Sequence, residues 1–293
     1  MKIAVVGATG KTGQAVTARL LEGGHQARAL ARDSARLQAL ARKGAESFPC
    51  DLSDPEKLRA AFTGVDGVYY CSPVGLQQAD PFGVERAWTR NAIAAAIAAG
   101  VGHFVYLSVV GADKPHGVVL IDTKHRLEVE LSISKLPYTV LRPNWFMDNL
   151  EISNAEQLLA GAFGYPLSAE ARLQPVAVRD IAEAAVRALE TGPRRSALEV
   201  MGPQALTFAQ MAEIMGQALG RAVEYRPLNR KVFLDAASPL VGKEYALRLL
   251  EMFSHFEKEN PIGDPSPLRR ELGMTLTSFE DYARQLATRL TGR

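Results

Sequence analysis

A single lysine stands within an apolar helical pattern in the segment VVLIDTKHRLEVEL, residues 118 to 131. Lys124 falls four residues after Leu120 and three before Leu127, so the three side chains share one face of the expected helix. Such a lysine either lays its stem along the core and brings its ammonium to water, or binds a polar group at a site. Both interpretations are open from these residues alone.

A glycine-rich segment, VVGATGKTG, opens the chain's first helical pattern. Gly7, Gly10 and Gly13 follow a strand pattern directly, in a G-x-x-G-x-x-G variant of the dinucleotide-binding fingerprint. Glycines at these points permit a tight turn and close approach of the backbone to a pyrophosphate, and the helix N-terminus supplies amides and partial positive charge. A purely structural turn is the alternative. The strand–turn–helix context favours a nucleotide site.

The residue after the second strand distinguishes the two nicotinamide dinucleotides. A carboxylate there binds the ribose hydroxyls of NAD, whereas an arginine accommodates the 2′-phosphate of NADP. The segment ARALARDS, residues 27 to 34, puts Arg32 at this point and Asp33 next to it, so a shift of one residue would reverse the prediction. We expect NADP(H) to be favoured over NAD(H). Asp51, after the third strand, is expected either to accept a hydrogen bond from the adenine amine or to cap the next helix.

Alternating strand and helix patterns position these residues. Six short apolar runs alternate with six helical patterns, which predicts an α/β fold with a doubly wound, mostly parallel sheet. The expected strands are 2–6, 27–31, 46–48, 67–70, 103–108 and 138–141, and the expected helices are 13–22, 34–42, 55–62, 83–99, 118–134 and 145–160.

The alternation breaks after about residue 150. The later patterns predict a strand and helix over 173–190 with Asp180 as the cap, a helix between Thr207 and Gly220, and a last helix from Ser278. We therefore expect residues 1–150, with the returning strand and helix near 173–190, to form a nucleotide-binding domain. Residues 151–293 are expected to form a smaller, mainly helical substrate part at the strand ends.

Composition excludes several classes of partner. The 293 residues carry a formal net charge of +2 without a charged block, so neither nucleic acid nor a membrane is an expected partner. The chain shows no secretory signal and no apolar run of the roughly 20 residues that a spanning helix needs. Its two cysteines and five histidines show no metal-ligand spacing. We expect a cytoplasmic protein without a metal.

Motifs along nearly the whole chain resemble one family. They are VVGATGKTG, ALARD, AAGVGHFVYLSVVGA, the lysine of IDTKHRLEVEL, YTVLRPNWFMDNL, VAVRDIAEA and LTFAQMAEIMGQALGR. The chain resembles the NmrA-like branch of the atypical short-chain dehydrogenases, which includes NADPH-dependent quinone reductases and triphenylmethane-dye reductases. The resemblance implies a Rossmann fold, NAD(P) binding and a small C-terminal substrate part. The family also includes regulators that bind the dinucleotide, so the resemblance does not fix one activity.

The resemblance also gives Lys124 a role, which is to hydrogen-bond the nicotinamide ribose. Ordinary short-chain dehydrogenases carry a tyrosine four residues before this lysine to protonate a carbonyl, but Leu120 stands there in this chain. Ser108 at a strand end is the alternative proton donor, and His116 and His125 are weaker candidates. We therefore expect a small-molecule hydride acceptor that needs little help with protonation, such as a quinone-like or other flat conjugated molecule.

The expected site has three parts. The catalytic candidates are Lys124 and Ser108. The expected substrate residues are Asn144, Trp145, Phe146 and Phe253, for which core packing is the alternative. The expected cofactor residues are Gly7, Thr9, Gly10, Lys11, Thr12, Gly13, Arg32, Asp51, Leu52, Ser72, Pro73, Lys124 and Pro143.

Two other functions compete with a quinone-type reductase. A non-catalytic NADP(H)-binding redox sensor with a protein partner would need no open cavity beside the nicotinamide, so an open aromatic cavity favours the enzyme. An atypical ketoreductase or isomerase would require an acid or base that the sequence does not identify.

Overall fold

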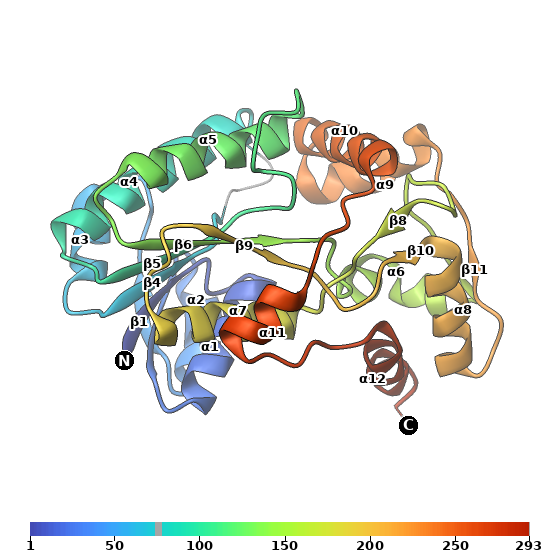
Figure 1. Cartoon of the computed structure of the whole chain (residues 1–293), viewed down its shortest axis with the longest axis horizontal. Helices are drawn as coiled ribbons and strands as arrows, with labels where there is room; N and C mark the ends of the chain where they lie inside the picture. The colour runs from blue at the N-terminus through green and yellow to red at the C-terminus, as the bar shows by residue number, and fades with distance from the viewer. Residues whose placement is uncertain (74–77, 293) are drawn as a thin grey trace.

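The strands expected in the first half form one sheet in the computed structural model, which describes residues 1–73 and 78–292. The sheet has seven strands in the order β3-β2-β1-β4-β5-β6-β9, and every neighbouring pair is parallel. This is the predicted doubly wound Rossmann-type sheet (Figure 1). The strands are β1 (Lys2–Val6), β2 (Gln26–Ala31), β3 (Glu46–Pro49), β4 (Gly67–Tyr70), β5 (His103–Leu107), β6 (Tyr138–Pro143) and β9 (Ala197–Val200).

Helices cover both faces of the sheet because the strands are apolar on consecutive positions. Ile3 and Val5 of β1 face one core cluster, whereas Ala4 and Val6 face another. Figure 1 shows the two helical layers on opposite sides of the sheet. One layer holds α1 (Lys11–Glu22), α2 (Ser34–Ala41), α7 (Val178–Thr191) and α11 (Ser266–Leu272), and the other holds α3 (Pro55–Phe62), α4 (Pro81–Ala98) and α5 (Val119–Ile133).

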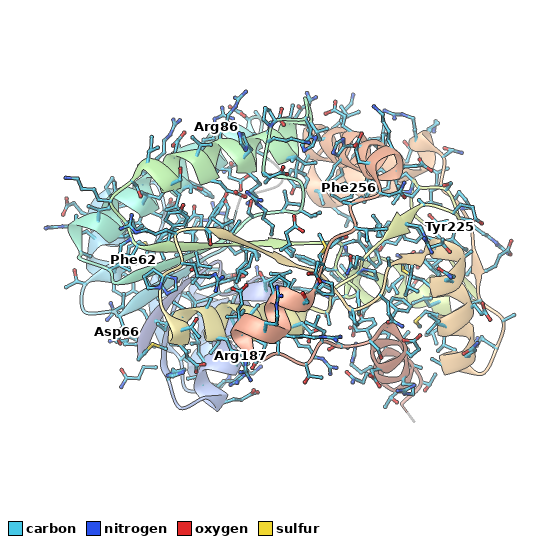
Figure 2. The ribbon with its side chains drawn as sticks, viewed as in Figure 1. Phe62, Asp66, Arg86, Arg187, Tyr225 and Phe256 are labelled. Carbon is cyan, nitrogen blue, oxygen red and sulfur yellow. The ribbon has the colours of Figure 1, made fainter. Side chains whose placement is uncertain are left out.

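The remaining helices and four two-residue strands gather at one end of the sheet (Figure 1). They surround a third apolar core that includes Tyr225 and Phe256, both labelled in Figure 2. The helices are α6 (Asn149–Leu159), α8 (Phe208–Leu219), α9 (Arg230–Val241), α10 (Lys243–Glu259) and α12 (Phe279–Thr291). Strand β8 (Arg172–Leu173) pairs with β10 (Leu206–Thr207), and β7 (Ala162–Phe163) pairs with β11 (Glu224–Tyr225).

The helix caps of the second half are partly as predicted. Thr207 begins α8 with a capping box, Gly220 ends it in the left-handed conformation, and Ser278 caps α12. Asp180 was expected to cap a helix, and that prediction is wrong. It lies within the first turn of α7, where its carboxylate accepts 2.8 Å hydrogen bonds from both Thr277 N and Thr277 Oγ1.

Two other elements differ from the sequence prediction. The helix expected from residue 145 begins at Asn149, because Trp145 and Met147 exchange backbone hydrogen bonds with Val176 first. The last strand of the sheet is β9, which follows α7 instead of preceding it. Its four residues alternate between half-buried and buried positions, as expected at a sheet edge, and a pattern this short gives a weak sequence signal.

Candidate functional site

A groove runs along the carboxyl ends of β1, β2 and β4, and we call it the glycine-loop groove. Its volume is about 490 Å³. Among the residues expected to bind the dinucleotide, those that line it are Gly7, Thr9, Gly10, Arg32, Leu52, Ser72 and Pro73. Ligands of open parallel sheets bind in this position, outside the carboxyl ends of the strands.

The three loop positions require glycine to different degrees and for different structural reasons. Gly7 has φ +74°, and a Cβ there would lie 2.5 Å from Cys71 O, so the fold itself requires glycine. A Cβ on Gly13 would lie 2.1 Å from Gly7 O. The absence of a side chain therefore allows α1 to pack closely against the loop. Gly10 is less restricted, since its added Cβ would meet only Gly7 O, at 3.3 Å. Its side toward the groove is open to a ligand.

The groove also carries polar groups that suit a dinucleotide. Ser72 Oγ is buried in the groove wall and makes no hydrogen bond to another group of residues 1–73 or 78–292. Helix α1 starts at Lys11, immediately after the loop, so its free backbone amides face the same end of the sheet. A pyrophosphate would satisfy both kinds of donor.

Arg32 and Asp33 at the end of β2 have different surroundings. Strand β2 ends at Ala31, and the guanidinium of Arg32 lies over the Trp88 ring with 5.3 Å to the ring centroid. Asp33 is the N-cap of α2, where its carboxylate accepts from Ala35 N and Arg36 N. Both residues line the groove, but the Asp33 carboxylate is already engaged by the helix amides, whereas the Arg32 guanidinium makes no such bond within the described part of the chain.

Six other predicted cofactor residues lie outside the lining of this groove, among them Lys124 and Pro143, which are described below. Lys11, Thr12 and Gly13 form the first turn of α1. Asp51 accepts hydrogen bonds from Ser53 N (2.8 Å) and Ser53 Oγ (2.7 Å), and these bonds lower the pKa of its carboxyl. The cap of α3 is Asp54, so the alternative that Asp51 caps this helix is wrong.

Lys124 is held in a buried ion pair. Its ammonium donates to Glu85 Oε1 at 2.6 Å and to Leu107 O at 3.4 Å, and it lies 5.2 Å from the centroid of the Tyr106 ring. Only 15% of its side chain and 9% of that of Glu85 are exposed, so the ammonium does not reach freely into water. Burial acts to lower the pKa of Lys124, but Glu85 and Tyr106 outweigh it and hold that pKa well above its usual value. The lysine therefore remains a cation.

Sequence reasoning missed Glu85. It lies on α4, on the buried face that also carries Trp88 and Ala92. An acid three and seven residues before apolar positions of one helix face was a usable signal, because a buried carboxylate needs a positive partner. The spacing alone did not indicate that the partner would be Lys124.

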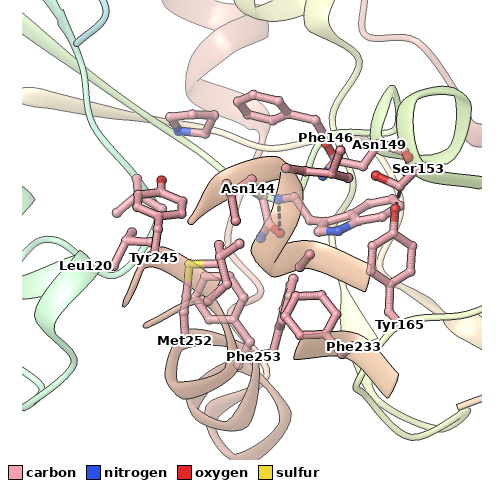
Figure 3. A pocket seen from close by; sticks show the side chains of 18 of the residues that line it. Leu120, Asn144, Phe146, Asn149, Ser153, Tyr165, Phe233, Tyr245, Met252 and Phe253 are labelled. Atoms are coloured by element: carbon pink, nitrogen blue, oxygen red, sulfur yellow. Dashed lines mark hydrogen bonds between the residues drawn. The ribbon is translucent and has the colours of Figure 1, made fainter. Parts of the chain in front are cut away.

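A second space, which we call the aromatic cavity, lies beyond the ends of β5 and β6 and has a volume of about 420 Å³ (Figure 3). Its walls include the predicted substrate residues Asn144, Trp145, Phe146 and Phe253, together with Ser108 and Pro143. Leu120 also lines it, with Tyr165, Phe233 and Tyr245. Leu240 of α9 lines both this cavity and the glycine-loop groove, so the two spaces are neighbours at α9.

Ser108 and Asn144 are already engaged by neighbouring groups. Ser108 Oγ donates to the carboxylate of Glu128, which also accepts from Arg142 at 2.6 Å. The Asn144 amide donates to Pro261 O and accepts from Trp145 N, both at 2.7 Å. In this arrangement Ser108 has no proton to give to a ligand in the cavity, and Asn144 shapes the loop.

The other candidates divide between wall and core. Trp145 is 5% exposed and packs edge-on against Tyr165 and Phe208, so it belongs to the core as well as to the cavity wall. His116 contacts His255, and His125 Nδ1 lies 2.9 Å from Ala112 O. Neither histidine is among the described residues that line the groove or the cavity.

The part of the chain that the structure describes contains neither a metal-ligand cluster nor a membrane-spanning helix. It has no group of three or more histidine, cysteine, aspartate or glutamate side chains placed to hold a metal ion. None of its described helices combines the length and apolar character that crossing a membrane requires.

Comparisons with known proteins agree with this geometry. The family model described as the NmrA-like family matches residues 1–283. The NAD(P)H azoreductase of Xenophilus azovorans is 34% identical over 284 residues, which cover 96% of each chain. An NADPH-dependent quinone oxidoreductase of Escherichia coli, solved with NADPH, has a TM-score of 0.80 at 29% identity, covering 97% of this chain and 99% of that one. The triphenylmethane reductase of Citrobacter sp., solved with NADP(H), has a TM-score of 0.80 at 25% identity with the same coverage.

Proposed function

The chain belongs to the NmrA-like family and is an NAD(P)H-dependent oxidoreductase, and we propose that it transfers hydride to a quinone-like or other flat conjugated acceptor. NADP(H) is its favoured dinucleotide. In this proposal the glycine-loop groove binds the dinucleotide, and residues 151–293 supply most of the substrate-binding walls.

The observation that carries the proposal is that the two spaces are neighbours at α9. Leu240 lines both the aromatic cavity and the glycine-loop groove, so a ligand in either space would contact this side chain. Flat rings such as those of Phe146, Phe233 and Phe253 suit a flat conjugated molecule, because apolar and aromatic walls bury its faces. A sensor without turnover would need no such cavity, so this feature favours the enzyme over the regulator.

In this proposal the residues of the groove and the cavity bind and orient the reactants, and they take little part in the chemical step. When bound, NADPH supplies the hydride. The glycine loop, Ser72 and Arg32 would hold its phosphates, and Lys124, fixed by Glu85, would face the nicotinamide ribose. Leu120 gives the cavity an apolar wall one turn before Lys124. Leu120 cannot donate a proton. The site therefore suits conjugated acceptors, because their hydride adducts are stabilised by delocalisation or are neutral.

The test is oxidation of NADPH and NADH by the purified protein in the presence of a quinone, a cationic triphenylmethane dye, an aromatic azo compound and an aldehyde. We expect oxidation that depends on the acceptor, with NADPH preferred. Tight NADPH binding without oxidation by any acceptor would overturn the proposal and favour the sensor.

A variant pair connects this activity with the cavity. Leu120→Trp would fill part of the cavity, so KM for the acceptor should rise at least about tenfold while NADPH affinity changes little. Ile133→Trp is the matched control, because Ile133 lies on the same helix, α5, and is 80% exposed. Equal effects of the two variants would place the acceptor elsewhere.

A further inference from the structure

A tyrosine from a distant part of the chain lies near the position at which this chain lacks the tyrosine of ordinary short-chain dehydrogenases. Tyr245 of α10 lines the aromatic cavity together with Leu120, the residue that occupies the position of the missing tyrosine. Figure 3 shows both side chains at the same end of the cavity. Helices α5 and α10 pack against each other, so the two positions are neighbours although they are far apart in sequence.

The hydroxyl of Tyr245 is available, in contrast with that of Tyr165. Tyr165 Oη donates to Asn149 O at 2.9 Å and accepts from Asn154 Nδ2 at 3.0 Å. Tyr245 Oη makes no hydrogen bond to any group of residues 1–73 or 78–292. Of the two tyrosines that line the cavity, Tyr245 is therefore the one with a free donor.

Helix α4 fixes both Tyr245 and Lys124. Phe82 stacks on the Tyr245 ring with a centroid separation of 5.7 Å and an interplanar angle of 6°. One turn later on the same helix, Glu85 holds the Lys124 ammonium. Helix α4 thus holds a phenol and a cation close enough to interact, although Lys124 itself is not among the described residues that line the cavity or the groove.

The surroundings of Tyr245 keep its phenol protonated, so that only a strong base can take its proton. Burial, followed by the nearby Glu85 carboxylate, raises the pKa of Tyr245 to about 12, while the Lys124 ammonium acts in the opposite direction. The phenol is therefore neutral at ordinary pH. After donation, the tyrosinate would be stabilised by the Lys124 cation.

We propose that Tyr245 donates the proton to acceptors whose hydride adduct is a stronger base than tyrosinate, which include aromatic azo compounds and aldehydes. This inference rests on the proposed reductase function. One nitrogen of an azo bond accepts the hydride, with its two electrons, as the C4–H bond of NADPH breaks to leave NADP⁺. The other nitrogen takes the proton from Tyr245 Oη, which gives a hydrazine, and the tyrosinate regains a proton from solvent.

Acceptors of another class do not need this proton. A cationic triphenylmethane dye becomes neutral when it accepts hydride, so its reduction involves no proton transfer. The dye therefore serves as an internal reference within each protein sample. Any general damage to folding, cofactor binding or cavity shape affects the dye and the azo compound together.

The experiment measures kcat for the azo compound divided by kcat for the dye, with NADPH saturating. In Tyr245→Phe this ratio should fall about 100-fold, the size of a typical general-acid contribution. Met252→Leu is the control, because Met252 lies on the same helix and lines the same cavity but has no proton to donate, so its ratio should match that of the wild type. The wild type should show a solvent isotope effect on azo reduction and none on dye reduction, because only the azo compound takes up a proton.

Three results would overturn the inference. An unchanged ratio in Tyr245→Phe would show that the proton comes from elsewhere. A wild type that reduces the dye but no azo compound or aldehyde would leave Tyr245 without a role, although the reductase function would stand. A wild type that reduces no acceptor would overturn the proposed function and this inference with it.

Discussion

The glycine-loop groove and the aromatic cavity are built in opposite ways. Groove residues come mostly from successive βα units within the first 73 residues, including two glycines of the loop. The cavity joins strand ends near Ser108 and Pro143 to side chains of α9 and α10, more than 80 residues later in the chain. The groove therefore depends on local conformation, whereas the cavity depends on how distant helices pack.

The groove's dependence on backbone geometry predicts the largest effect. In Gly13→Ala the added Cβ would lie 2.1 Å from Gly7 O, and backbone atoms cannot move away as a flexible side chain can. We expect the free energy of unfolding to fall by about 4 kcal/mol or more, with loss of NADPH binding. Gly10→Ala is the comparison, since its Cβ would approach Gly7 O only to 3.3 Å. It should weaken NADPH binding with a much smaller loss of stability, as measured by urea denaturation and NADPH titration.

The buried ion pair of Lys124 and Glu85 predicts the next largest effect. Lys124→Met leaves Glu85 as a buried carboxylate without its partner, which should cost about 3–5 kcal/mol of folding stability. The double variant Lys124→Met with Glu85→Gln should regain most of that stability but not the NADPH affinity. Recovery of both would show that Lys124 acts only as a structural partner of Glu85.

The sequence predicted residues that line both spaces but not the pairs that distant helices form, and the reason is physical. Gly7, Gly10 and Arg32 could be identified because strand ends and turn glycines are set by neighbours in the chain, and six of the seven sheet strands follow from the same local patterns. Glu85 and Tyr245 could not, because their roles depend on which helices face each other. Strand periodicity carries no information on such pairs.

The same limit explains one prediction that was wrong and one hydrogen-bond partner that the sequence did not indicate. Asp180 has the residue type of a helix cap, but its carboxylate is used by Thr277, nearly a hundred positions away. Ser108 ends a strand at the cavity as expected, yet its hydroxyl is turned to Glu128. In both cases the position follows from sequence, and the hydrogen-bond partner does not.

The charge at the end of β2 gives a smaller effect that is specific to the groove. Arg32→Ala should weaken NADPH binding about 10- to 100-fold, the value of a hydrogen bond to a charged group, and change NADH binding little. Titration of both dinucleotides measures this selectivity. Arg36→Ala is a neighbouring control with a weaker expected effect, because the Arg36 guanidinium donates to Thr9 O at 2.6 Å. Equal loss of NADPH and NADH affinity in Arg32→Ala would contradict recognition of the 2′-phosphate.

Leu240 should give the smallest effect, and it tests whether the two regions act together. Its side chain is 76% exposed and α9 has no buried residue, so Leu240→Ala should change the unfolding free energy by no more than about 0.5 kcal/mol. Because Leu240 lines both spaces, removing its apolar contact should raise the NADPH Kd and the acceptor KM together, each about threefold. Ile133→Ala, at an exposed position outside both linings, should change neither constant. A rise in only one constant would mean that α9 belongs to one region alone and that the groove and cavity bind their ligands independently.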